Sequence, residues 1–407
     1  MAEGRDAAMS VVLLAVALGL GGWLAFSKRL AKSDSWQATL TPLASIMGSG
    51  FLISAPLLGG VMGHWAVFGI AALLVVAYFV GGAIRFNIRS FEPVEHKKGV
   101  PQTLALVSRW ALVAAYFISV VYYLELLAAF VLKNLGIEGA TEANLIVSGI
   151  LVLIGGIGMT SGLSLLEKLE RYTVSLNLGM VGALLVALAI YNTRLAVAGD
   201  WRLPNLDSAI DGQDLRILLG LLIVVQGFET SRYLGDKHSA DQRVATMRVA
   251  QLLSGGIYLV FVALATVLFQ PDMGADVTAI LTLTAVVAAF LPIMLSVAAV
   301  GSQFSAAVAD TAGAGGLVED LSNNRLPQRW AYGIILAGTL GIAWLTDVNQ
   351  IIATASRAFA LFYALQCAVA AMMASRGEDR SVGLTIWFGL LSTLCLGVVV
   401  FGVASEG

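Results

Sequence analysis

Residues 41–52 of the chain read TPLASIMGSGFL, and two glycines, Gly48 and Gly50, flank a serine in the middle of this long apolar run. Glycine weakens a helix and lets the backbone approach a ligand closely. We therefore predict an unwound stretch here. Its free N–H groups, at the start of a half-helix, suit an anionic group such as a carboxylate. The alternative is a small-residue face that packs against a neighbouring helix.

A second apolar run is interrupted in a similar way at residues 225–233, which read VQGFETSRY. Gly227 is followed by the acidic Glu229, and a carboxylate is costly at membrane depth unless it faces a cavity or a partner. The alternative is that Glu229 already lies in the headgroup region and forms a simple ion pair with Arg232, three residues further along.

The composition is that of a membrane protein. Of the 407 residues, 58% are hydrophobic and only 12% are charged, too few charges to cover the surface of a soluble protein of this size. The net charge of -2 argues against a nucleic-acid partner. The two cysteines lie inside apolar runs and the three histidines are scattered, so neither a disulfide framework nor a metal-type spacing is present.

Many segments are long and apolar enough to cross a bilayer as helices. They lie at approximately residues 8–27, 38–60, 64–86, 102–132, 142–160, 167–192, 214–233, 246–269, 287–312, 330–346, 349–373 and 382–403. These twelve runs predict an all-α polytopic protein, with a short additional helix near 276–286. The first run lacks a preceding basic region and is followed by Lys28, Arg29 and Lys32, so we expect a retained helix rather than a signal peptide.

The basic residues orient these runs. With Lys28 on the cytoplasmic side, seventeen of the 24 lysines and arginines fall in cytoplasmic segments and five in external ones. Such a bias follows the positive-inside rule, and shifting the count by one helix destroys it. We therefore expect a multi-pass protein of the cell (inner) membrane with both termini external.

Two interrupted spans, each opening a set of five helices, are typical of inverted-repeat transporters. The GSGF of residues 48–51 resembles the first-helix motif of the amino acid–polyamine–organocation (APC) superfamily, and the GFE of residues 227–229 resembles its sixth-helix motif. Residues 236–258 are similar to its cytoplasmic entry into helix seven, and 324–327 (NRLP) to the tail after helix eight. The resemblance covers about residues 38–400.

The resemblance implies the five-plus-five inverted repeat of the LeuT type. The first repeat is then expected within residues 37–195 and the second within 196–375. An extra N-terminal transmembrane helix is expected within 1–36 and an additional C-terminal helix within 376–407.

A substrate site is expected where the two breaks meet. Free N–H groups at the first break hold an anionic group, the second break holds the opposite end of the solute, and a tyrosine is a candidate lid, although packing is its simpler role. The candidate residues are Gly48, Ser49, Gly50, Tyr122, Gln226, Gly227, Phe228 and Glu229.

The coupling ion has two candidates. Sodium-coupled relatives hold the ion between helix-one carbonyls and a helix-eight hydroxyl, which implies carbonyls of Ala44, Met47 and Gly301 and the hydroxyl of Ser305 here. Serines in membrane helices also commonly bond their own backbone, which is the simpler interpretation. Other relatives place a lysine on helix five, but the matching position in this chain is Asn177.

A proton is the alternative coupling ion. Asp310, Glu125 and Glu229 are the candidate proton carriers, because buried carboxylates can titrate near neutrality. Glu125 and Arg357 also lie inside spans and could form an external gate, with a purely structural ion pair as the alternative.

The leading functional hypothesis is a secondary active transporter that moves an amino acid or a related small solute by alternating access, coupled to Na⁺ or H⁺. An inorganic ion transporter of the same fold is the alternative. An enzyme is disfavoured, since the sequence has no Walker A motif, no histidine-rich metal cluster and no G-x-S-x-G. A channel would need a repeated pore loop or an oligomeric filter. The expected partners are a small-molecule substrate and the lipid bilayer, with no cofactor.

Overall fold

The structure is a computed structural model in which residues 2–48, 50–137, 139–206, 209–235, 237–271, 273, 276–376 and 380–405 are described. Over these residues every regular element is a helix. The first half contains α1 (Ala2–Phe26), α2 (Lys28–Ala31), α3 (Asp34–Gly48), α4 (Phe51–Met62), η1 (Gly63–Trp65), α5 (Ala66–Ser90), η2 (Glu92–Val94), α6 (Val100–Leu135), α7 (Ala140–Ser161) and α8 (Ser164–Ala198). The second half contains α9 (Gly212–Gly220), η3 (Leu222–Val225), η4 (Phe228–Leu234), α10 (Ala240–Ala265), η5 (Thr266–Leu268), α11 (Ala279–Ala285), α12 (Leu291–Leu321), α13 (Gln328–Leu345), α14 (Val348–Ala374) and α15 (Val382–Phe401).

The chain is an all-helical, multi-pass membrane protein. Nine segments of the described residues are long and apolar enough to cross a membrane. The segment Asp34–Ser90 combines two of the twelve expected runs. The run 214–233 is absent from these nine because it is divided among α9, η3 and η4, and α13 is the other expected run that is not included. The short helix expected near 276–286 is α11.

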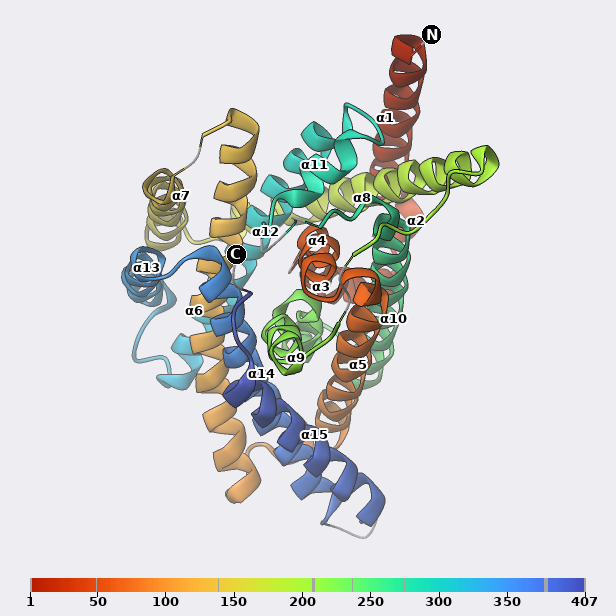
Figure 1. Ribbon diagram of the computed structural model, residues 1–407. Coiled ribbons are helices and arrows are strands. Elements are labelled where there is room, and N and C mark those ends of the chain that lie inside the picture. The colour runs from red at the N-terminus through yellow and green to blue at the C-terminus, as the bar shows by residue number, and fades with distance from the viewer. Residues whose placement is uncertain are drawn as a thin grey trace.

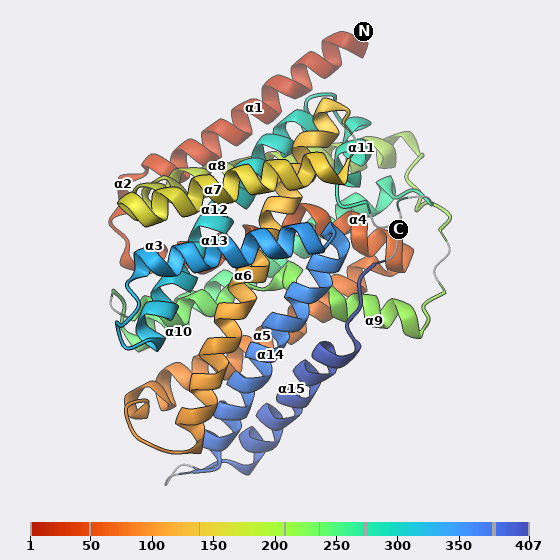
Figure 2. The same cartoon turned by 90° about the vertical axis from the view of Figure 1, so that its left-hand side faces the viewer.

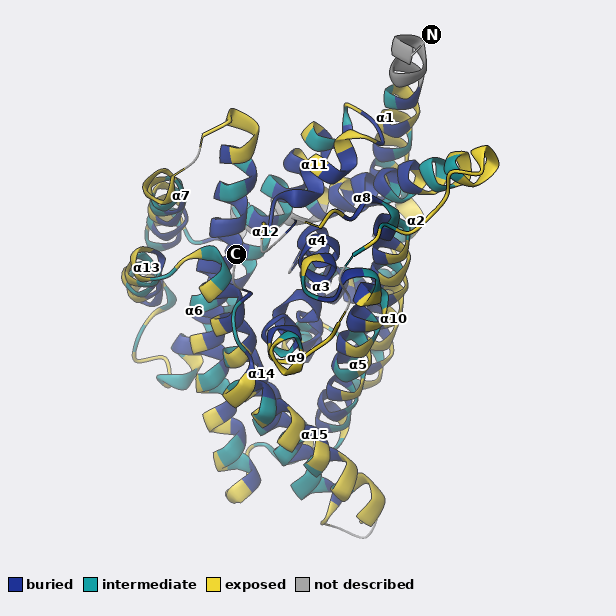
Figure 3. Ribbon diagram, in the orientation of Figure 1, coloured by how far each residue is buried: buried dark blue, intermediate teal, exposed yellow. Residues whose placement is uncertain are grey.

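The interrupted helices lie at the centre of the bundle. Figure 1 shows α3, α4 and α9 in the middle, with α5, α6, α8, α10, α12 and α14 around them. Figure 3 shows α4 mainly buried, α9 exposed over much of its length, and the outer helices exposed on one face. Many of the exposed side chains are large and apolar, such as Trp23, Phe68 and Trp344, which is expected where a helix faces lipid.

The expected extra helices lie at the periphery. The helix α1 packs against α8, where Gly179 has no room for a side chain because Ala17 O of α1 would lie 2.3 Å from its Cβ. The helix α15 packs against α14, and Ser392 donates a hydrogen bond to Ala364 O. Both peripheral helices therefore brace helices that line the centre.

The basic connections gather at one end of the bundle. Figure 2 shows α2, the connection from α5 to α6 and the connection from α12 to α13 on the left, and both ends of the chain on the right. Lys28 and Arg29 belong to α2, and Lys97 and Lys98 to the α5–α6 connection. Below, this end of the bundle is called the basic end.

Candidate functional site

The first break lies where the sequence predicts it. The helix α3 ends at Gly48, and α4 begins at Phe51 with Gly50 as its N-cap; Ser49 lies outside the described residues. A Cβ on Gly50 would lie 3.0 Å from the Tyr122 hydroxyl and 3.1 Å from Val224 Cα. A larger residue at position 50 would therefore press against helix α6 and against the second break.

The second break is longer than predicted. The sequence places it at Gly227, but α9 already ends at Gly220 and the chain continues as the short 3₁₀ segment η3. The Ile223 N–H is then free to donate to Ser356 Oγ of α14 at 2.9 Å. At Gly227 the backbone has φ +114°, a conformation that glycine adopts without strain.

The two breaks touch each other. A Cβ on Gly227 would lie 2.5 Å from Ser45 Oγ and 2.7 Å from Ile46 N. The Tyr258 hydroxyl lies 2.9 Å from Ile46 O and 2.7 Å from Val224 O, so it can donate to a carbonyl at either break. This tyrosine, from α10, was not identified from the sequence, because only the fold reveals its two distant partners.

Glu229 is fully buried and does not pair with Arg232. Its Oε2 accepts hydrogen bonds from the Gly227 N–H at 3.0 Å and the Tyr363 hydroxyl at 2.8 Å, while Oε1 is buried without a hydrogen-bond partner. The neighbouring Phe228 stacks on the Tyr363 ring with centroids 5.1 Å apart. The ion pair considered from the sequence is therefore wrong, and Glu229 ties the second break to α14 instead.

A cavity of about 660 Å³ adjoins the first break. Its polar lining includes Ser45 of α3, Asn177 of α8, and Ser302, Ser305 and Asp310 of α12. This volume falls in the range of small-molecule sites. It is lined by hydroxyls, an amide and one buried carboxylate, whose Oδ2 accepts a hydrogen bond from Ser119 of α6.

The expected ion-site residues fall largely on this cavity. Ala44, Met47 and Ser305 line it, whereas Gly301 is not among the lining residues. A Cβ on Gly301 would lie 3.2 Å from Thr173 Cγ2 of α8.

The expected substrate residues lie beside the cavity rather than on it. Gly48, Gly50, Tyr122 and residues 226–229 pack together around the two breaks and are not among the cavity's lining residues. Gln226 donates to the Tyr123 hydroxyl at 2.8 Å. The cavity instead borders Thr41 and Thr230, which the sequence did not single out because isolated threonines are common in membrane helices.

The expected gate between Glu125 and Arg357 is not formed. Glu125 is buried, and its Oε1 has no hydrogen-bond partner. Arg357 is exposed and its Nε donates to Val399 O, near the end of α15, at 2.7 Å. The ion pairs within the described residues do not include this pair. An arginine can satisfy the last carbonyls of a neighbouring helix, which explains the difference.

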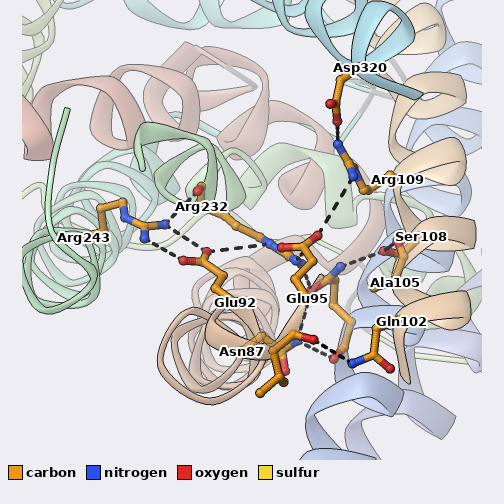
Figure 4. A network of polar contacts seen from close by, with 12 residues as sticks. Asn87, Glu92, Glu95, Gln102, Ala105, Ser108, Arg109, Arg232, Arg243 and Asp320 are labelled. Atoms are coloured by element: carbon orange, nitrogen blue, oxygen red, sulfur yellow. Dashed lines mark hydrogen bonds and ion pairs between the residues drawn. The ribbon is translucent and has the colours of Figure 1, made fainter. Parts of the chain in front are cut away.

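An ion network crosses the basic end of the bundle (Figure 4). Arg243 of α10 holds Glu92 through two hydrogen bonds of 3.0 and 2.6 Å. Arg232 of η4 lies 4.0 Å from Glu92 and 3.7 Å from Glu95. The network therefore joins the inner part of the second break to the α5–α6 connection.

The network continues to the end of the cavity. Arg109 of α6 pairs with Asp320 of α12 and lies 4.0 Å from Glu95. Arg109, Asp320 and Lys237 also line the cavity, which thus extends from the middle of α3 to the basic end. Within the described part of the chain, no group of three or more histidines, cysteines and acids lies close enough to hold a metal ion.

Known proteins share this architecture. Crystal structures of three mutants of a manganese transporter from Eremococcus coleocola match with a TM-score of 0.56, covering 92% of this chain and 86% of theirs at 12% sequence identity. An uncharacterized protein of Aquifex aeolicus is 39% identical over 386 residues, 93% of each chain. A family model described as an APC superfamily transporter matches residues 28–402. The chain therefore belongs to the APC superfamily of transporters.

Proposed function

We propose that the protein is a secondary active transporter that moves an amino acid or a related carboxylated amine across the cell membrane by alternating access. The cavity that adjoins the first break and reaches the basic end is the main support for this proposal. Amino acids have both an anionic and a cationic end, and the paired breaks offer a half-helix N-terminus for the first and the buried Glu229 for the second. No enzymatic activity is proposed.

In this proposal the structure corresponds to the inward-facing state. The basic end is cytoplasmic by the positive-inside rule, so both termini are external and the cavity leads to the cytoplasm. Residues 37–195 and 196–375 form the two inverted repeats, each opening with an interrupted helix. The breaks act as hinges, since α3 and η4 can move apart from α4 and α9 without breaking a continuous helix.

Sodium and proton coupling have different sites on this cavity. The sodium site consists of Ala44, Met47 and Ser305, which line the cavity, and Gly301, which does not. The proton alternative places the exchangeable proton on one of three carboxylates. Asp310 lines the cavity, Glu229 is buried at the second break, and Glu125 is buried on α6.

Uptake into proteoliposomes tests these proposals. A panel of radiolabelled amino acids is offered under a sodium gradient, a proton gradient or neither, with ⁵⁴Mn²⁺ as the inorganic probe. Amino-acid uptake driven by one gradient supports the proposal. Sodium dependence lost in Ser305→Ala supports the sodium site, and proton dependence lost in Asp310→Asn supports the proton alternative. Amino-acid uptake that depends on neither gradient would contradict both proposed coupling sites.

A manganese or other inorganic ion transporter is the second candidate. It is favoured by the fold shared with the manganese transporter of Eremococcus coleocola. The amino acid is placed first because the cavity presents a single buried carboxylate among hydroxyl and amide groups. Uptake of ⁵⁴Mn²⁺ without uptake of any amino acid would reverse this order.

A further inference from the structure

Gln303 of α12 reaches the first break. Its side chain is buried, and its Nε2 donates a hydrogen bond to Gly48 O at 3.1 Å. Its Oε1 is buried as well, without a hydrogen-bond partner. The chemistry fixes this orientation, because a flipped amide would place its oxygen against the Gly48 carbonyl oxygen.

This carboxamide lies where α12, the cavity and the first break meet. Ser302 and Ser305, on the same helix, line the cavity. A Cβ on Gly48 would lie 3.7 Å from Ser302 Oγ and from Ala306 Cβ. Gln303 itself is not among the lining residues, so its carboxamide meets a solute only when α3 moves away from α12.

A buried acceptor oxygen without a partner is costly, and native proteins rarely retain one without a role. An amide oxygen takes an N–H donor or a hard cation and repels an anion. The Oε1 of Glu229, at the second break, is another buried acceptor without a hydrogen-bond partner. Both side chains are linked to the last turn of α3. Gln303 is linked through its Nε2 bond to Gly48 O, and Glu229 through Gly227, which contacts Ser45.

We propose that Gln303 recognises a positively charged group of the transported species through its Oε1, either the ammonium of the solute or the coupling sodium ion. This inference rests on the function proposed above and adds to it a specificity residue on α12. The Nε2 bond to Gly48 O positions the carboxamide, and the oxygen binds the ligand when the break opens.

Two variants separate recognition from packing. Gln303→Met has a similar shape and removes both amide atoms, whereas Gln303→Glu keeps acceptor oxygens and loses the donor to Gly48 O. Both variants lose the bond to Gly48 O, but only Gln303→Glu keeps an acceptor for a cation. Recognition therefore predicts that Gln303→Met weakens ligand binding by at least about tenfold and clearly more than Gln303→Glu does. A purely structural amide predicts equal losses in both variants, because both lose the bond to Gly48 O.

The matched control is Gln251→Met. Gln251 is also a buried glutamine, but both of its amide atoms are partnered, by Arg85 and by Ala77 O on α5. It is expected to alter thermal stability without changing affinity. Binding of alanine, leucine, lysine and glutamate is measured on each purified full-length variant by isothermal titration calorimetry, with Na⁺ or with choline as the only cation.

The outcomes are distinct. A tenfold loss in Gln303→Met in choline assigns the oxygen to the solute ammonium, and a loss of the sodium effect alone assigns it to the ion. Wild-type affinity in Gln303→Met, or equal losses in Gln303→Met and Gln303→Glu, overturns the inference and leaves the proposed function standing. A wild-type protein that binds none of the four amino acids with either cation overturns both.

Discussion

At the scale of single residues, the two breaks use glycine for different reasons. Gly227 has a left-handed φ and a backbone contact with Ser45, so a side chain there is both strained and obstructed. Gly48 ends a regular helix, and its Cβ position has only ordinary contacts at 3.7 Å. The glycine pattern alone does not distinguish these two cases, because the contact between the breaks joins residues far apart in sequence.

Gly227→Ala should therefore destabilise the protein, and Gly48→Ala should not. The clash and the backbone conformation at Gly227 together cost about 1–3 kcal/mol. Substitution at Gly48 stays within about 0.5 kcal/mol. The apparent melting temperature in detergent checks this pair. Equal melting temperatures for the two variants would mean that the breaks do not touch as described.

The buried Glu125 and the exposed Arg357 should behave as independent sites. Arg357 caps the carbonyl of Val399 rather than pairing with Glu125. The destabilisation in Glu125→Gln and in Arg357→Ala should then add within about 0.5 kcal/mol in the double variant. Chemical denaturation of the four proteins in the cycle measures this. A coupling energy well above that value would restore the ion pair expected from the sequence.

At the scale of elements, the first break could be predicted and the extent of the second could not. The G-x-G of residues 48–50 does interrupt its helix, as predicted, although the same spacing at 156–158 and 313–315 lies within the continuous helices α7 and α12. The early end of α9 depends on Ser356 and Tyr258, which bind Ile223 N–H and Val224 O from helices much later in the chain. Partners of freed backbone groups come from tertiary structure, and local sequence does not contain them.

The C-terminal segment after α15 holds α9 in place. Val403 N–H donates to Arg216 O at 3.1 Å, and Arg216 Nε donates to Phe401 O at 3.2 Å. A Cβ on Gly220 would lie 2.0 Å from Val403 O, so only glycine permits this approach. The outer half of the second broken helix is thereby tied to the end of the chain.

Gly220→Ala should release this segment. The added methyl group meets backbone atoms rather than a flexible side chain, so the segment after Phe401 must move away. Faster hydrogen exchange is expected in peptides that cover residues 399–405, with little change in α14. Gly19→Ala is the control, because its Cβ would meet nothing within 4 Å. Unchanged exchange in the Gly220→Ala variant would show that the segment does not depend on this contact.

At the scale of the whole molecule, charge distribution and cavity geometry lead to the same orientation. The basic residues were assigned to one side from sequence alone, and the fold brings their connections together at one end. The cavity extends to that same end, where Arg109, Asp320 and Lys237 line it. Hydropathy and charge predicted the spans, whereas the direction in which the cavity leads is a property of helix packing.

Thiol labelling tests this orientation directly. The native Cys367 and Cys395 are both buried, so replacing them by serine or alanine gives a background without reactive thiols. Ala309→Cys then places a thiol on the cavity wall, and Leu135→Cys places one on the exposed end of α6, at the opposite end of the bundle.

A membrane-impermeant maleimide should label Ala309→Cys in inside-out vesicles and Leu135→Cys in right-side-out vesicles. This result is expected because the proposed orientation opens the cavity to the cytoplasm. A transported solute that favours closure should then slow labelling of Ala309→Cys while leaving Leu135→Cys unchanged. Labelling of both variants from the same side would contradict the shared direction of charge and cavity, and labelling with the two sides exchanged would invert the topology while keeping the fold.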